Sequence, residues 1–266
     1  MNVELISVRV LPVLSLVVLS ACAFPQKPSD WRKTSLSPLE FANRIDKGLY
    51  GLKGALGQAT FRATFFDGGN GNGRLVNRIR DRKNFRVEFV RIDAKARDPF
   101  VGQIMVSTNG SINLVTSTVG TKPLVSGQNP GFVSAAANPV QVFPEHFTQL
   151  MFEHYVTGKS RFAPFVRALL KGDGGFSVKM ESRTMQGGGR SLPQVRLFAT
   201  RTAAAAKKLG PATIEIVTDT NMWLPLQIRV NMTNLKKQNA QFDWQSMWSG
   251  PFRFDDKWFK KPGKSA

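Results

Sequence analysis

The most constraining feature of this 266-residue chain is a strict alternation of apolar and polar side chains that returns in many short segments. The clearest is the segment 224–233, in which Leu, Leu, Ile, Val and Met alternate with Pro, Gln, Arg, Asn and Thr. Side chains that alternate with a period of two point to opposite faces of a β-strand. Each such segment therefore predicts a strand with one apolar face to bury, and together they predict an antiparallel sheet.

These segments form two blocks, one on each side of the middle of the chain. They predict strands at 58–66, 74–79, 85–92, 102–108 and 111–118, then at 176–181, 194–202, 211–218, 224–233 and 241–248. Turn residues separate them, and Asn109-Gly110 is the strongest two-residue hairpin signal. About ten strands follow. Because neither block looks complete by itself, we expect residues 37–262 to form a single domain.

Helical patterns precede the first block and separate the two blocks. Ser37 and Glu40 match a capping box, and Pro38 occupies the first helical position, where its missing N–H costs nothing. Apolar residues then recur at helical spacing through residue 52. The segment between the blocks predicts two further short helices with one apolar face each, at 143–154 and 162–170.

The N-terminus carries the signals of an exported lipoprotein. An apolar run from Val10 to Leu19 has the length of a signal-peptide core and is too short to cross a bilayer as a helix. It ends at Leu19-Ser20-Ala21-Cys22, which resembles the bacterial lipobox and contains the only Cys of the chain. We expect residues 1–21 to be a signal peptide and Cys22 to receive diacylglycerol and an acyl chain such as palmitate. A buried cysteine in an N-terminal strand and an uncleaved segment are the alternatives.

Acylation of Cys22 would hold the mature protein at a membrane surface, because each buried methylene contributes about 0.8 kcal/mol. Ala23 rather than Asp follows the cysteine, and the sorting rule associated with such signals then favours the outer membrane, facing the periplasm. Residues 22–36, which are rich in proline, predict a tether. Residues 263–266 would be a short basic tail.

The chain is strongly basic, since 37 Lys and Arg residues oppose 18 Asp and Glu residues, a formal net charge of +19. This balance favours anionic partners. For an anchored protein we expect anionic lipid head groups, and we do not expect nucleic acid, which an exported lipoprotein rarely meets. Candidates for a basic contact surface are Arg78, Arg80, Arg82 and Lys83. Simple solvated strand faces are the alternative.

Few residues are available for catalysis or for a metal site. One Cys excludes an intrachain disulfide and a Cys-rich metal site. His146 and His154 are eight residues apart on a predicted helix, about 12 Å along its axis, so one ion cannot bridge them. The Gly-rich loops at 68–73 and 187–189 lack the Lys-Ser/Thr of a phosphate loop, and no Ser lies in a nucleophile elbow. We expect a monomer that is not an enzyme and has no cofactor, catalytic residue or metal.

One local motif resembles a known superfamily. Asp219-Thr220-Asn221-Met222-Trp223-Leu224-Pro225-Leu226 is similar to the turn before a strand beginning Leu-Pro in the periplasmic lipoprotein carriers and receptors, the LolA-like and LolB-like proteins with their RseB and LppX-like relatives. A hairpin and an aromatic strand with Phe242-Asp243-Trp244 follow, as in that superfamily. The lipobox, the leading helix and the inserted helices fit the same pattern, and the resemblance covers residues 37–262.

The resemblance implies an α+β fold in which a strongly curved antiparallel sheet forms a half-barrel, the inserted helical pair acts as a lid, and the cavity holds acyl chains. The residue pattern agrees in one respect, because an open curved sheet must bury its apolar face under helices or lipid. Candidates for lining this face are Phe61, Phe65, Val87, Phe89, Ile104, Val106, Leu114, Val178, Met180, Leu197, Ile214, Ile216, Ile228, Val230, Phe242 and Trp244.

Two functions remain open at this point. The first is a carrier or receptor in lipoprotein transport that binds acyl chains of a lipid or lipoprotein, driven by burial of apolar surface at about 25 cal/mol per Å². The second is a non-enzymatic envelope interaction or sensor protein, with a core filled by its own side chains and a basic surface that contacts a partner. The alternating pattern describes both, and the state of the apolar face distinguishes them.

Overall fold

The computed structural model describes residues 30–91, 100–118, 124–126, 162–172, 174–187 and 190–260. The chain separates into two units, residues 1–30 and 31–266, and the described fold lies in the second. The predicted signal peptide, Cys22, the helix at 143–154 and the basic tail at 263–266 lie outside the described residues.

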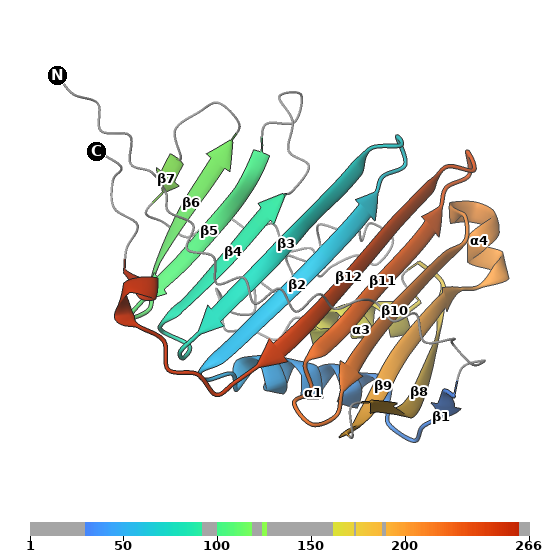
Figure 1. Ribbon diagram of the computed structural model, residues 1–266. Helices are drawn as coiled ribbons and strands as arrows, with labels where there is room; N and C mark the ends of the chain where they lie inside the picture. Colours follow the sequence, from blue (N-terminus) through green and yellow to red (C-terminus); the bar gives the residue numbers. More distant parts are fainter. Residues whose placement is uncertain are drawn as a thin grey trace. The chain divides into compact units, whose positions relative to one another are not determined.

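One open antiparallel sheet of twelve strands dominates the described part of the chain (Figure 1). Its strand order is β1-β8-β9-β10-β11-β12-β2-β3-β4-β5-β6-β7, so the last strand pairs with β2 and joins the two blocks in one sheet. The strands are β1 (Arg32–Lys33), β2 (Ala55–Thr64), β3 (Asn70–Ile79), β4 (Phe85–Arg91), β5 (Phe100–Thr108), β6 (Ser111–Thr118), β7 (Leu124–Ser126), β8 (Phe176–Gly187), β9 (Arg190–Arg201), β10 (Ala212–Asp219), β11 (Pro225–Thr233) and β12 (Asn239–Ser249).

The α+β class and the antiparallel sheet are confirmed. Ten of the twelve strands have at least seven residues, and these correspond to the ten that the alternation predicted. The other two, β1 and β7, have two and three residues. Because β1 and β7 stand at the two ends of the strand order, the sheet is not closed into a barrel. The alternation did not predict the two end strands, because a segment of two or three residues is too short to show it.

Four helical segments accompany the sheet in the described residues: α1 (Pro38–Tyr50), α3 (Phe162–Leu170), α4 (Ala203–Leu209) and the 3-10 turn η3 (Asp256–Phe259). The start of α1 is confirmed, because the Ser37 hydroxyl accepts a hydrogen bond from the Glu40 amide at 3.1 Å. The Glu40 carboxylate pairs with Arg44 and does not complete the capping box. The segment α3 confirms the second of the two inserted helices, whereas α4 was not predicted.

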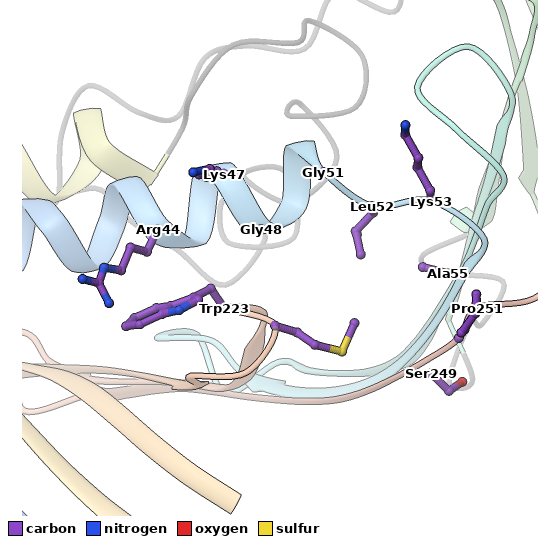
Figure 2. Close-up of a pocket in the computed structure, with 12 residues that line it drawn as sticks. Arg44, Lys47, Gly48, Gly51, Leu52, Lys53, Ala55, Trp223, Ser249 and Pro251 are labelled. Atoms are coloured by element: carbon purple, nitrogen blue, oxygen red, sulfur yellow. The ribbon is translucent and has the colours of Figure 1, made fainter.

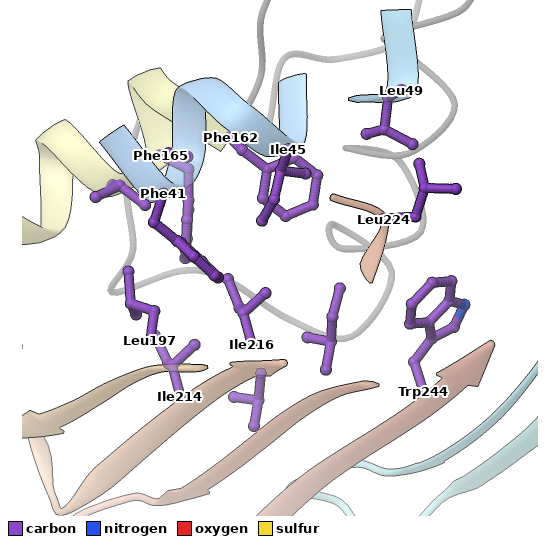
Figure 3. Packing of buried hydrophobic residues seen from close by; sticks show 14 of the residues in the cluster. Phe41, Ile45, Leu49, Phe162, Phe165, Leu197, Ile214, Ile216, Leu224 and Trp244 are labelled. Carbon is purple, nitrogen blue, oxygen red and sulfur yellow. The ribbon is translucent and has the colours of Figure 1, made fainter. Parts of the chain in front are cut away.

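The helices α1 and α3 pack on one face of the sheet, which we call the covered face. In Figure 3, Phe41 and Ile45 of α1 and Phe162 and Phe165 of α3 point toward Leu197, Ile214 and Ile216 of the sheet. The strand β2 shows the expected alternation, with Ala59 and Phe61 buried and Thr60 and Arg62 exposed. The core therefore lies between the two helices and the covered face.

A buried carboxylate joins the two helices. Asp46 of α1 is 4% exposed and accepts hydrogen bonds from the backbone amides of Phe162 at 3.0 Å and Ala163 at 2.9 Å. The first amides of a helix have no partner within it, and an anion is favourable at that end. Asp46 thus caps α3 from a neighbouring helix.

The sheet domain begins before the predicted boundary at residue 37. Arg32 and Lys33 pair with Ser182 and Glu181 of β8, so the last part of the predicted tether is an end strand of the sheet. The guanidinium of Arg196 lies 4.5 Å from the centre of the Trp31 ring and holds this segment on the face opposite to the helices. The tether pattern, read from proline content, gave no sign of this pairing.

Candidate functional site

One row of apolar side chains crosses the covered face from strand to strand. Neighbours in register along it are Phe61, Trp244, Ile228, Ile216, Leu197 and Met180, from β2, β12, β11, β10, β9 and β8. None of the six is more than 9% exposed. Six of the predicted lining residues therefore form a continuous buried band.

A second row runs beside the first. It contains Phe242, Val230, Ile214 and Val178, of which only Val178 is partly exposed. The rings of Phe61 and Phe242 lie 6.4 Å apart, centre to centre, and connect the two rows. That these residues share one face is confirmed, and their role in binding a ligand stays a prediction.

The other half of the sheet continues the covered face. Val87 is buried opposite Asn77, and Phe65 packs against the core just beyond the end of β2. Phe89 and Leu114 hold register positions on this same face of β4 and β6. Val87, Phe89 and Leu114 are therefore consistent in register with the two rows.

Two predicted lining residues lie on the wrong face. Ile104 pairs with Glu88 and Val106 with Arg86, so both are on the face opposite to α1 and α3. The prediction failed because residues 104–106 are all apolar, which leaves the phase of the alternation undecided. Val106 is nevertheless fully buried, in the region where η3 contacts β4 and β5.

The four residues of the predicted basic surface fall into two groups, one that contacts the C-terminal segment and one that is exposed. Arg78 pairs with Glu88 at 2.8 Å and stacks on Trp258, and Arg80 pairs with Asp256 at 2.5 Å, so both hold the C-terminal segment against the sheet. Burial lowers the pKa of Arg78, an effect that the Glu88 charge opposes. Arg82 and Lys83 are exposed in the turn between β3 and β4.

A cavity of about 770 Å³ lies at the C-terminal end of α1 (Figure 2). Three segments that are distant in sequence form its wall: the end of α1 with the residues that follow it, the turn between β10 and β11, and the end of β12. The lining residues are Arg44, Lys47, Gly48, Gly51, Leu52, Lys53, Ala55, Met222, Trp223, Ser249, Gly250 and Pro251. Leu52 and Ala55 also belong to the core, so the cavity adjoins the covered face.

The motif that carried the family resemblance forms one wall of this cavity. The Asp219 carboxylate accepts hydrogen bonds from the amides of Asn221 at 2.9 Å and Met222 at 2.7 Å and so fixes the turn. Trp223 has a φ of 57°, a conformation that is rare for a bulky residue, and its ring lies 4.7 Å from the Arg44 guanidinium. The sequence indicated the motif but not the cavity, because the remaining walls come from elsewhere in the chain.

No helix among the described residues is long and apolar enough to span a membrane. No group of three or more His, Cys, Asp or Glu side chains among them is placed to hold a metal ion.

No family model matches the chain, and no curated protein matches it. Solved structures that it resembles include MucB with MucA from Pseudomonas aeruginosa, at 15% identity over 85% of this chain and 61% of that chain, with a TM-score of 0.38. The chain thus spans about three fifths of the length of the MucB structures.

Two other similar structures are a LolA superfamily protein from Nitrosomonas europaea and LprF from Mycobacterium bovis. The first shows 10% identity over 85% of this chain and 99% of that chain, with a TM-score of 0.32. The second shows 14% identity over 84% of this chain and 100% of that chain, with a TM-score of 0.34.

Proposed function

We propose that this protein binds acyl chains of a lipid or lipoprotein on the covered face and acts as a carrier or receptor in the cell envelope, anchored through Cys22. The observation that carries the proposal is the buried row from Phe61 to Met180, which extends apolar side chains across six strands beneath two helices. Burial of ligand on such a band needs no catalytic group, and each methylene buried contributes about 0.8 kcal/mol.

The centre of the row contains a buried polar atom without a partner among the described residues. The indole nitrogen of Trp244 is buried and makes no hydrogen bond within the part of the chain that the structure describes, although a buried Trp N–H usually finds an acceptor. Acyl chains are attached through an ester or amide carbonyl, which is an acceptor of the right kind. This donor supports a ligand that brings a carbonyl into the apolar band.

Access to the band requires α1 and α3 to separate from the sheet. Because Asp46 joins the two helices, we infer that they move as one lid. The end of α1 beside Leu52 and Ala55 offers a starting point, since these two residues belong both to the cavity wall and to the core.

A second candidate function is favoured by the packing under the helices. Phe41, Ile45 and Phe165 are at most 1% exposed, as expected for a core filled by its own side chains. The protein would then contact a partner through its surface, with Arg82 and Lys83 as exposed cations in the turn between β3 and β4.

The two functions are separated by ligand analysis. Protein purified gently from membranes should carry lipid in native mass spectrometry and should bind a fluorescent fatty-acid ester. The substitution Trp244→Phe keeps an aromatic ring but removes the five-membered part of the indole with its N–H, so we expect ester affinity to fall about 5- to 10-fold, the value of one hydrogen bond. Trp258→Phe, on the opposite face, is the matched control and should leave the affinity unchanged.

A protein that carries no lipid and ignores the fluorescent ester would contradict acyl binding. Capture of a protein partner that is lost after Arg82→Glu and Lys83→Glu, in a folded variant, would then support the second candidate.

A further inference from the structure

We propose that the cavity at the C-terminal end of α1 binds the anionic head group of an amphiphile, a phosphate or carboxylate, while the attached chain passes to the covered face. The inference rests on the proposed function and narrows it, because it selects acidic amphiphiles over neutral ones. It is carried by the charge of the cavity wall, by the conformation of Trp223 and by the contact of the cavity with the core.

The cavity wall is positively charged. Arg44, Lys47 and Lys53 line it, and the described lining residues include no Asp or Glu. Arg44 pairs with Glu40, whereas Lys47 and Lys53 form no ion pair within the part of the chain that the structure describes. Two uncompensated ammonium groups around one concave space favour an anion there.

The conformation of Trp223 indicates a wall that is held in place. A bulky residue at positive φ is strained, and such strain persists only where neighbouring contacts maintain it. Here Asp219 fixes the amides before Trp223, and the Thr218 hydroxyl donates to the Leu224 carbonyl oxygen at 2.7 Å. The Trp223 ring in turn supports Arg44 at the cavity wall. Strained residues of this kind concentrate at ligand sites.

The helix α1 touches the turn between β10 and β11 at Gly48, and this contact sets the width of the cavity. A Cβ on Gly48 would lie 2.6 Å from the Met222 carbonyl oxygen and 2.8 Å from that of Trp223, so the helix and turn are in direct backbone contact. Beyond this contact, α1 ends and the chain continues through Leu52 and Lys53. The apolar wall at Leu52 and Ala55 then meets the core, which is the arrangement that a charged head with an apolar chain requires.

Isothermal titration with three soluble probes tests the inference. Decyl phosphate, below its aggregation concentration, supplies anion and chain; inorganic phosphate supplies the anion alone; decyl glucoside supplies the chain with a neutral head. We expect decyl phosphate to bind at least tenfold more tightly than either of the other two. The double substitution Lys47→Gln and Lys53→Gln should reduce its affinity at least fivefold and leave decyl glucoside unaffected.

The matched control is Lys207→Gln with Lys208→Gln on α4. Both lysines are exposed, the change in net charge is the same, and the length of β10 separates them from the cavity. Thermal unfolding should show that both double variants are folded. The control should bind decyl phosphate as the wild type does.

Each other outcome has a definite meaning. Equal wild-type affinity for decyl phosphate and decyl glucoside overturns head-group selection and leaves the proposed function standing, whereas no binding of either overturns both. If both double variants lose the same affinity for decyl phosphate, the anion is attracted by the net charge of the protein in general. That result overturns the proposed site. If inorganic phosphate binds as tightly as decyl phosphate, the decyl chain adds no affinity. That result overturns the connection between the cavity and the covered face.

Discussion

The two faces of α1 differ in what they contact. On one face, Phe41 and Ile45 are fully buried against the sheet, and Asp46 caps α3. On the other face, Lys47 and Gly51 line an open cavity with exposed cations. The same helix therefore serves both as core and as the wall of a candidate site, and changes on the two faces should have separable consequences, the first for stability and the second for binding.

The largest effect is expected from Phe41→Ala on the packed face. Removal of a fully buried Phe leaves a cavity, and the free energy of unfolding should fall by about 3–5 kcal/mol. Urea denaturation followed by circular dichroism measures the change. Asn43→Ala, at an exposed position of the same helix, is the control and should stay within about 0.5 kcal/mol. A loss below about 1 kcal/mol for Phe41→Ala would show that the packed face is loosely held.

The next effect concerns the connection between the helices. Asp46→Ala leaves two buried amides of α3 without acceptors, which should cost about 2–4 kcal/mol. Asp46→Asn keeps one acceptor oxygen and should cost about half as much. Amide hydrogen exchange should show faster exchange at Phe162 and Ala163 in both variants. Unchanged exchange there would contradict the view of α1 and α3 as one lid.

Two glycines on the cavity face of α1 differ in how closely other backbone atoms approach them. Gly48→Ala places a Cβ 2.6 Å from a backbone oxygen, so it should destabilise by about 1–3 kcal/mol although alanine favours helices. Gly51→Ala meets its nearest such atom at 3.3 Å, and its effect should remain within about 0.5 kcal/mol. Thermal unfolding of the two variants side by side measures the difference. Equal effects would contradict the close backbone contact between Gly48 and the turn that contains Met222.

The sequence predicted the elements whose local pattern is unambiguous. Alternation located strands such as β2 and β11, and Ser37 with Pro38 located the start of α1, because these signals depend on neighbouring residues alone. Prediction failed at Ile104 and Val106, where consecutive apolar residues conceal the phase, and at α4, whose run of alanines has no apolar face. The cavity could not be predicted, because residues 44–55, 222–223 and 249–251 meet only in the folded chain.

The smallest effect on stability is expected at the cavity wall, from Lys47→Gln on α1 with Lys53→Gln just after it. Both side chains are exposed and form no ion pair within the described residues, so the free energy of unfolding should change by less than about 0.5 kcal/mol. Decyl phosphate affinity should fall in the same variant, which would separate binding from stability along one helix. A loss of stability above about 1 kcal/mol would instead mean that these lysines hold α1 in place, and the contrast between its two faces would then disappear.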